Sequence, residues 1–151
     1  MIRIECNSDE AMLLALGVSK NKIIHTRGKC QIFDFLSKNK NCICLVDEDP
    51  KSPHHYYEKE LTLMGEDHNV MYYSDSKRKN SIFILKPRLE EWFINLCKEH
   101  KINLFENGLT DDPSRLHEII YQNTIEFQKI LRILLKKNDV ALKHLQSIVN
   151  T

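Results

Sequence analysis

One apolar stretch constrains the fold more than any other: Cys42-Ile43-Cys44-Leu45-Val46, followed by Asp47-Glu48-Asp49-Pro50. A short continuous apolar run of this kind predicts a strand buried in the centre of a sheet. Pro50 prevents that strand from continuing, because proline has no amide hydrogen to donate to a neighbouring strand. The three acids therefore mark a strand end, which is where open α/β sheets bind their ligands.

The acids at this strand end have a defined geometry. Asp47 and Asp49 are two residues apart, so in extended backbone their side chains share one face while Glu48 points away. Two carboxylates held together repel each other unless a proton or a cation neutralises them. Oxygen ligands suit Mg²⁺ or Mn²⁺, so a divalent metal is the expected partner.

The segments around the central strand alternate between strand and helix patterns. Strands are predicted at 1–5 and 22–26, with helices over 8–17 and around 32–36, and this β-α-β-α-β order implies parallel strands. Two more strands are predicted at 70–73 and 81–85, joined by a charged turn, whereas 61–67 suggests the end of a short helix. We expect an α/β fold, a mostly parallel sheet flanked by helices over residues 1–107, with an all-helical extension over 108–151.

Composition limits the classes of partner. Lys and Arg number 22 against 21 Asp and Glu, and the net charge is +1. No overall basic field therefore attracts nucleic acid, so any such binding has to use local patches. The five cysteines follow no zinc-ligand spacing, and neither a signal segment nor a membrane-spanning run is present. We expect a cytoplasmic protein with reduced thiols and no membrane association.

Four acids are predicted to meet at one edge of the sheet. Glu5 ends the first strand and Asp9 opens the first helix. If the first and third strands are neighbours, Glu5 and Asp9 lie at the same carboxyl edge as Asp47 and Asp49. A single acid at such a place is usually a solvated cap, so it is the coincidence at two strand ends that indicates a functional site.

Three segments in order resemble one family. Glu5-Cys6-Asn7-Ser8-Asp9 follows the first strand, Leu45-Val46-Asp47-Glu48-Asp49-Pro50 ends the third, and Pro87-Arg88-Leu89-Glu90-Glu91-Trp92 follows a late strand. Together they resemble the Toprim domain, nearest to that of overcoming-lysogenization-defect nucleases and of small stand-alone bacterial Toprim-like proteins. Cys6 stands where that family has Gly. The resemblance covers about residues 1 to 105 and ends there.

The resemblance implies phosphoryl transfer on nucleic acid, DNA or RNA, assisted by Mg²⁺ or Mn²⁺. It implies a nuclease, in a bacterial defence or mobile-element setting. Glu5, Asp9, Asp47 and Asp49 would be metal ligands, with Glu90 as a further acid. Lys86 would stabilise charge in the transition state. The catalytic set would then be Glu5, Asp47, Asp49 and Lys86.

Other interpretations stay open. Small size and near-neutral charge favour a non-catalytic Toprim-like subunit that binds a protein partner, and the C-terminal helices could form a homodimer. A receiver-like signalling domain also clusters acids, but it would place paired acids after its first strand. The basic turn 76–79 is a phosphate contact or merely a soluble hairpin turn, and Arg27-Gly28-Lys29 is an anion site or a solvated turn.

Overall fold

The computed structural model describes all 151 residues and contains two compact units. The first comprises 1–6 and 21–88, and the second comprises 7–20 and 89–151. The boundary predicted after residue 107 falls inside the second unit, which also includes the first helix. None of the helices combines the length and the apolar composition that a membrane-spanning helix needs.

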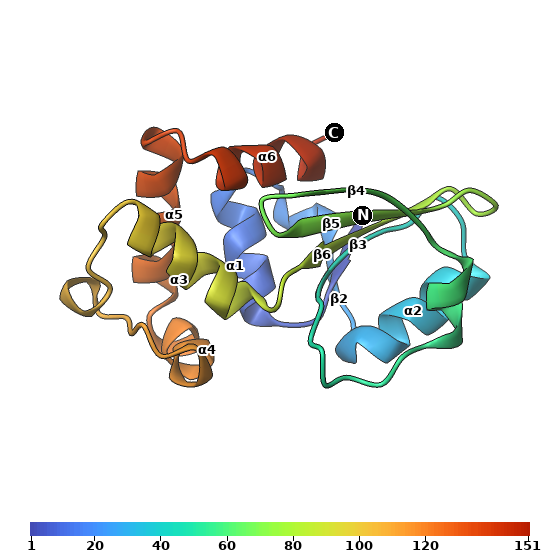
Figure 1. Cartoon of the computed structure of the whole chain (residues 1–151), viewed down its shortest axis with the longest axis horizontal. Helices are drawn as coiled ribbons and strands as arrows, with labels where there is room; N and C mark the ends of the chain where they lie inside the picture. The colour runs from blue at the N-terminus through green and yellow to red at the C-terminus, as the bar shows by residue number, and fades with distance from the viewer. The chain divides into compact units, whose positions relative to one another are not determined.

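A six-stranded sheet lies in the first unit (Figure 1). Its strand order is β2-β1-β3-β6-β5-β4. The first four of these strands are parallel to one another. Strand β5 pairs antiparallel with β6, and β4 pairs antiparallel with β5. The chain is thus an α/β protein with a mostly parallel sheet, as predicted. The strands are β1 (Ile2–Ile4), β2 (Ile23–His25), β3 (Ile43–Asp47), β4 (Thr62–Asp67), β5 (Val70–Asp75) and β6 (Asn80–Leu85).

Strands β1 and β3 are direct neighbours, which confirms the arrangement on which the site prediction depended. Ile2 pairs with Ile43 and Arg3 with Cys44, while β2 lies on the other side of β1. The strand order therefore reverses at β1, and the carboxyl ends of β1 and β3 lie side by side. Such a switch point is where α/β sheets open a crevice for ligands.

Helix α2 (Gly28–Lys38) covers one face of the sheet with an apolar stripe. The buried residues of α2 share one face of the helix, and they pack against every second residue of β3 and β6. Alternate residues of a strand point to the same side of the sheet, so these residues meet in one layer. The short 3-10 helix η2 (Tyr56–Glu60) adds Tyr57 to the same core. The buried members are Ile32, Phe33, Leu36, Cys44, Val46, Tyr57, Ile82 and Ile84.

One prediction in this unit was wrong: 61–67 does not end a helix but contains strand β4. Short apolar runs do not distinguish helix from strand, and here the antiparallel pairing with β5 decides the outcome, with an irregularity in register between Leu63 and Gly65. All six residues of β4 are exposed, because β4 is the edge of the sheet. The predicted strands at 70–73 and 81–85, with their charged turn, are confirmed.

The second unit is helical. Gln128 donates a hydrogen bond of 3.1 Å to the carbonyl of Ala11, which joins α5 to α1, and the rings of Phe93 and Phe127 meet edge to face at 4.8 Å. Trp92 is only 2% exposed, so it belongs to the core of this unit. The helices are α1 (Asn7–Ala15), α3 (Leu89–Glu99), α4 (Pro113–Gln122), α5 (Thr124–Lys136) and α6 (Val140–Val149), with 3-10 turns η1 (Lys20–Lys22) and η3 (Phe105–Asn107).

Candidate functional site

A cavity of about 240 Å³ lies at the carboxyl edge of the parallel strands. Three of the predicted acids line it: Glu5 directly after β1, Asp47 at the end of β3, and Asp49 two residues later. The structure therefore brings together the acids from two strand ends. The other lining residues are Gly28, Lys29, Cys30, Ser52 and Arg88.

The backbone holds Asp49 in a fixed place. The amide of Asp49 donates to the carbonyl of Pro87 at 3.0 Å, and the amide of Glu48 donates to that of Leu85 at 2.8 Å. The hydroxyl of Ser52 donates to the carbonyl of Asp49 at 2.9 Å. Asp49 itself has φ 39°, a left-handed conformation that costs a non-glycine residue on the order of 1 kcal/mol. The exits of β3 and β6 are thus tied together beside the cavity.

Lys29 is the main functional candidate that sequence reasoning left undecided. Its ammonium group donates to the carbonyl of Glu48 at 2.8 Å and lies 3.9 Å from a carboxylate oxygen of Glu58. The side chain is only 12% exposed, and its Nζ lies 5.7 Å from the centre of the Phe33 ring. The sequence feature that pointed to Lys29 was the turn Arg27-Gly28-Lys29 at the start of α2. Position alone could not show that the lysine turns back over β3.

A second cavity of about 390 Å³ adjoins the first, because Lys29, Asp49 and Ser52 line both. It also contains His54, whose Nδ1 lies 2.9 Å from a carboxylate oxygen of Glu58. The His54 side chain is 94% exposed. His55 has a different role: its Nδ1 accepts a hydrogen bond of 3.1 Å from the amide of Tyr57 and caps η2.

Lys86 directly follows β6 but does not line the acidic cavity. Its ammonium group pairs with Glu66 at 2.9 Å and with Glu48 at 3.9 Å, and the hydrogen bond to Glu66 raises the pKa of Lys86. The cation that lines the acidic cavity after β6 is Arg88. Nothing in the sequence separates these two cations, since both follow the same strand end.

The remaining predicted ligands belong to the second unit. Asp9 lies in the first turn of α1 and is 4% exposed. Glu90 lies in the first turn of α3, where one of its carboxylate oxygens is 2.8 Å from Nδ1 of His117. The ligand roles of Asp9 and Glu90 stay predictions.

Two further observations bear on the metal and the family. As the side chains stand, no three His, Cys, Asp or Glu residues lie together in a way that could hold a metal ion. Comparison with protein-family models, with curated proteins and with solved structures gives no match. Function is therefore inferred from the residues of the cavity itself.

Proposed function

We propose that this protein is a nuclease that hydrolyses phosphodiester bonds with the help of Mg²⁺ or Mn²⁺. One observation carries the proposal: Glu5, Asp47 and Asp49 line a single cavity with Lys29 and Arg88, at the switch point of a parallel sheet. Carboxylates beside fixed cations are what a phosphodiester needs, because the metal requires oxygen ligands and the phosphate requires positive charge. The resemblance to Toprim nucleases points to the same chemistry.

The acids fit a divalent metal by their donor chemistry. Glu5, Asp47 and Asp49 offer only carboxylate oxygens, the ligands that Mg²⁺ and Mn²⁺ prefer. Glu5, Asp47 and Asp49 are the residues that would hold the ion. A bound ion supplies a Lewis acid for the phosphoryl oxygen and lowers the pKa of a bound water.

The chain's own residues have separate tasks in this proposal. Lys29 and Arg88 bind the non-bridging oxygens of the phosphate, where negative charge grows in the transition state. The carboxylate of Glu5 accepts the proton of the attacking water. The backbone bonds around Asp49 keep the β3 exit in place, so that no ordering of this loop is needed when the substrate arrives.

A second candidate function, a non-catalytic subunit, is supported by strand β4. This edge strand exposes its full length, and Leu63 and Met64 are 49% and 59% exposed. An exposed edge with apolar side chains can accept an extended segment of another protein as an additional strand. This surface is separate from the acidic cavity, so the two functions can be tested independently.

The test of the metal site is thermal melting of the wild type and of Asp47→Ala/Asp49→Ala, with and without Mn²⁺. The free energy of unfolding of the wild type should rise by about 2.7 kcal/mol when the Mn²⁺ concentration is a hundredfold above the Kd. The double variant should ignore Mn²⁺, because it lacks two of the three carboxylates that would hold the ion. Asp67→Ala/Asp111→Ala, which removes two exposed acids elsewhere, controls for the change in charge.

The same proteins then separate the two functions in a cleavage assay on single- and double-stranded DNA and RNA. Wild type and the Asp67/Asp111 control should cleave, and Asp47→Ala/Asp49→Ala should not. Cleavage that survives in Asp47→Ala/Asp49→Ala would overturn the site. If wild type showed neither a metal response nor cleavage, the non-catalytic binding subunit would be favoured. The Leu63→Lys variant should then fail to bind the protein partner.

A further inference from the structure

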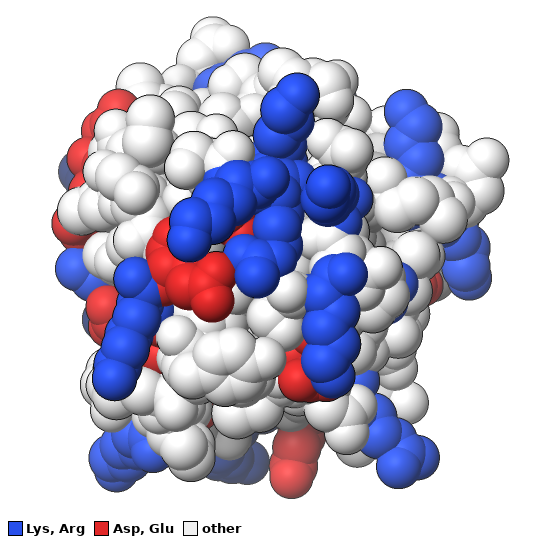
Figure 2. Space-filling model, turned by 90° about the vertical axis from the view of Figure 1, so that its right-hand side faces the viewer, with Lys and Arg blue, Asp and Glu red and all other residues white.

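The first unit carries a second charged surface at the opposite edge of the sheet. The turn between β5 and β6 lies at the amino end of β6, next to the C-terminal end of α2 and to η2. Figure 2 looks onto this end of the molecule, where Lys and Arg side chains gather around a small group of acids. The five residues of β3, which span about 16 Å, separate this edge from the acidic cavity.

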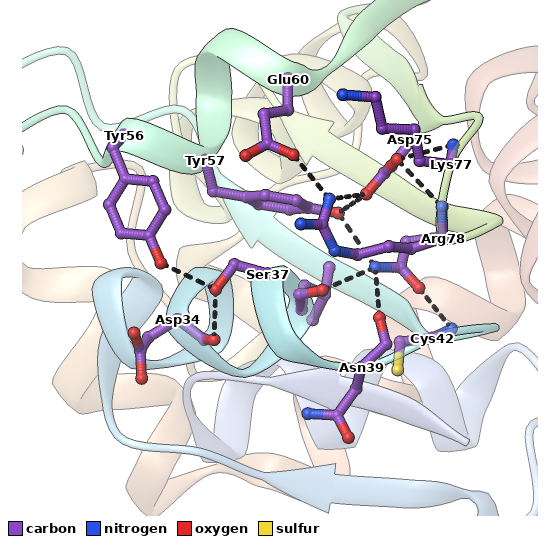
Figure 3. Close-up of polar contacts among 12 residues, drawn as sticks. Asp34, Ser37, Asn39, Cys42, Tyr56, Tyr57, Glu60, Asp75, Lys77 and Arg78 are labelled. Carbon is purple, nitrogen blue, oxygen red and sulfur yellow. Dashed lines mark hydrogen bonds and ion pairs between the residues drawn. The ribbon is translucent and has the colours of Figure 1, made fainter.

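A buried polar network fixes the three segments that carry these cations (Figure 3). The side-chain amide of Asn80 donates to the carbonyl of Leu36 at 2.9 Å and to that of Asn39 at 3.1 Å, which ties the turn to the end of α2. The same amide donates to the hydroxyl of Tyr57 at 2.9 Å, which ties it to η2. The basic side chains therefore project from a rigid base.

The cations of this surface divide into structural and free ones. The Arg78 guanidinium pairs with Glu60 at 2.6 Å and with Asp75 at 3.0 Å, and Lys38 pairs with Asp34 at 2.8 Å. Four exposed lysines in the same segments have no acidic partner: Lys40, Lys59, Lys77 and Lys79. Since the whole chain carries only +1, this is a local concentration of unneutralised charge.

An exposed aromatic ring accompanies these lysines. Tyr56 is 58% exposed, although its hydroxyl is held 2.9 Å from Oγ of Ser37 and its ring lies 4.3 Å from that of His55. Figure 3 shows Tyr56 at one end of the network and Lys77 at the other. A fixed ring open to solvent is a platform on which an unpaired base can stack, and lysines beside it can follow a phosphate backbone.

We propose that this surface, which we call the basic face (Tyr56, Lys40, Lys59, Lys77 and Lys79), binds single-stranded nucleic acid. The lysines contact phosphates and Tyr56 stacks on a base. A double helix offers no unpaired base to Tyr56, and an acidic protein offers neither stacking nor regular phosphates, so a single strand uses more of the surface than either. This inference rests on the proposed nuclease function and gives it a substrate class and an anchoring site.

The test is fluorescence anisotropy of a labelled single-stranded oligonucleotide in EDTA, so that neither metal nor cleavage contributes. Lys77→Gln/Lys79→Gln should weaken binding about tenfold at low salt and reduce the slope of log affinity against log salt by about 1.4. Tyr56→Ala should weaken binding of the single strand more than that of a duplex. Lys136→Gln/Lys137→Gln, two exposed lysines on α5 and just after it, is the control of equal charge.

Each outcome of this test supports or overturns the basic face. Equal losses in the Lys77/Lys79 and Lys136/Lys137 variants would overturn it, because binding would then follow net charge alone. Binding of polyglutamate with the affinity of the oligonucleotide, unchanged in Tyr56→Ala, would overturn it in favour of an acidic protein. Asp47→Ala/Asp49→Ala should bind the oligonucleotide at least as well as wild type, so a failure of the acidic site and a failure of the basic face are distinguishable.

Discussion

The hydroxyl of Tyr57 donates a hydrogen bond of 2.8 Å to Oδ2 of Asp75, and both residues are almost completely buried, at 0% and 1% exposure. Tyr57 belongs to η2, in the segment that follows the acids of β3, and Asp75 ends β5. The bond therefore fixes the segment that carries His54 and Glu58 into the second cavity. Burial raises the pKa of Tyr57, so its hydroxyl stays protonated and remains a donor.

Replacing Tyr57 with Phe should destabilise the fold by about 1–3 kcal/mol, because Asp75 loses a donor in a buried site. Tyr56→Phe is the matched control, since it removes the same atom from an exposed tyrosine. We expect the control to change the free energy of unfolding by less than about 0.5 kcal/mol. Urea denaturation measures both, and equal effects of the two substitutions would contradict a special role for the buried hydroxyl.

The stability of the protein should depend on pH through Asp75. Burial acts to raise the pKa of Asp75, but hydrogen bonds from Tyr57, from Arg78 and from the amides of Arg78 and Lys77 outweigh it, and the pKa is lowered. A lowered pKa stabilises the folded state above the unfolded value of about 3.9, and this contribution is lost as the pH falls below it.

Asp75→Asn removes this titration and keeps the shape of the side chain. The variant should be less stable than wild type at neutral pH, and the difference should shrink as the pH falls from about 5 to about 2.5. Urea denaturation at a series of pH values gives this difference. If the difference in free energy of unfolding between wild type and variant stayed constant over that range, the pKa of Asp75 would be the same in the folded and unfolded states.

Several features of the fold and site followed from the sequence because they are local. The apolar run before Asp47 and the alternation of strand and helix patterns predicted parallel strands with acids at their carboxyl ends. Glu5, Asp47 and Asp49 do line one cavity.

What the sequence did not reveal depends on contacts between distant residues. Strand β4 exists because β5 pairs with it, and its own residues are ambiguous. The network of Tyr57, Asp75 and Asn80 joins positions 18 and 23 residues apart, and no periodic pattern marks them. Of the two cations that follow β6, Lys86 pairs with Glu66 and Arg88 lines the cavity. Contacts with residues distant in the sequence decide between these two positions.

The five cysteines should differ in their reactivity toward iodoacetamide. All are free thiols, but only Cys30 is exposed, whereas Cys44 and Cys97 are buried. Burial raises the pKa of both thiols, that of Cys97 to about 12, so neither forms thiolate at neutral pH. Mass spectrometry should find Cys30 alkylated first, and Cys44 and Cys97 only in urea. Early modification of Cys97 would contradict the packing of α3.

Lys29→Met and Lys86→Met test which cation serves the acidic cavity. Lys29 lines both cavities and is fixed by the carbonyl of Glu48, whereas Lys86 is paired with Glu66. If Lys29 stabilises charge in the transition state, Lys29→Met should lower kcat about 10²–10³-fold. Lys86→Met should lower it less than about tenfold. Thermal melting of both variants separates this from loss of fold. A larger loss in Lys86→Met would instead support the role that the Toprim resemblance gives to Lys86, and would require the Lys86–Glu66 pair to open when substrate binds.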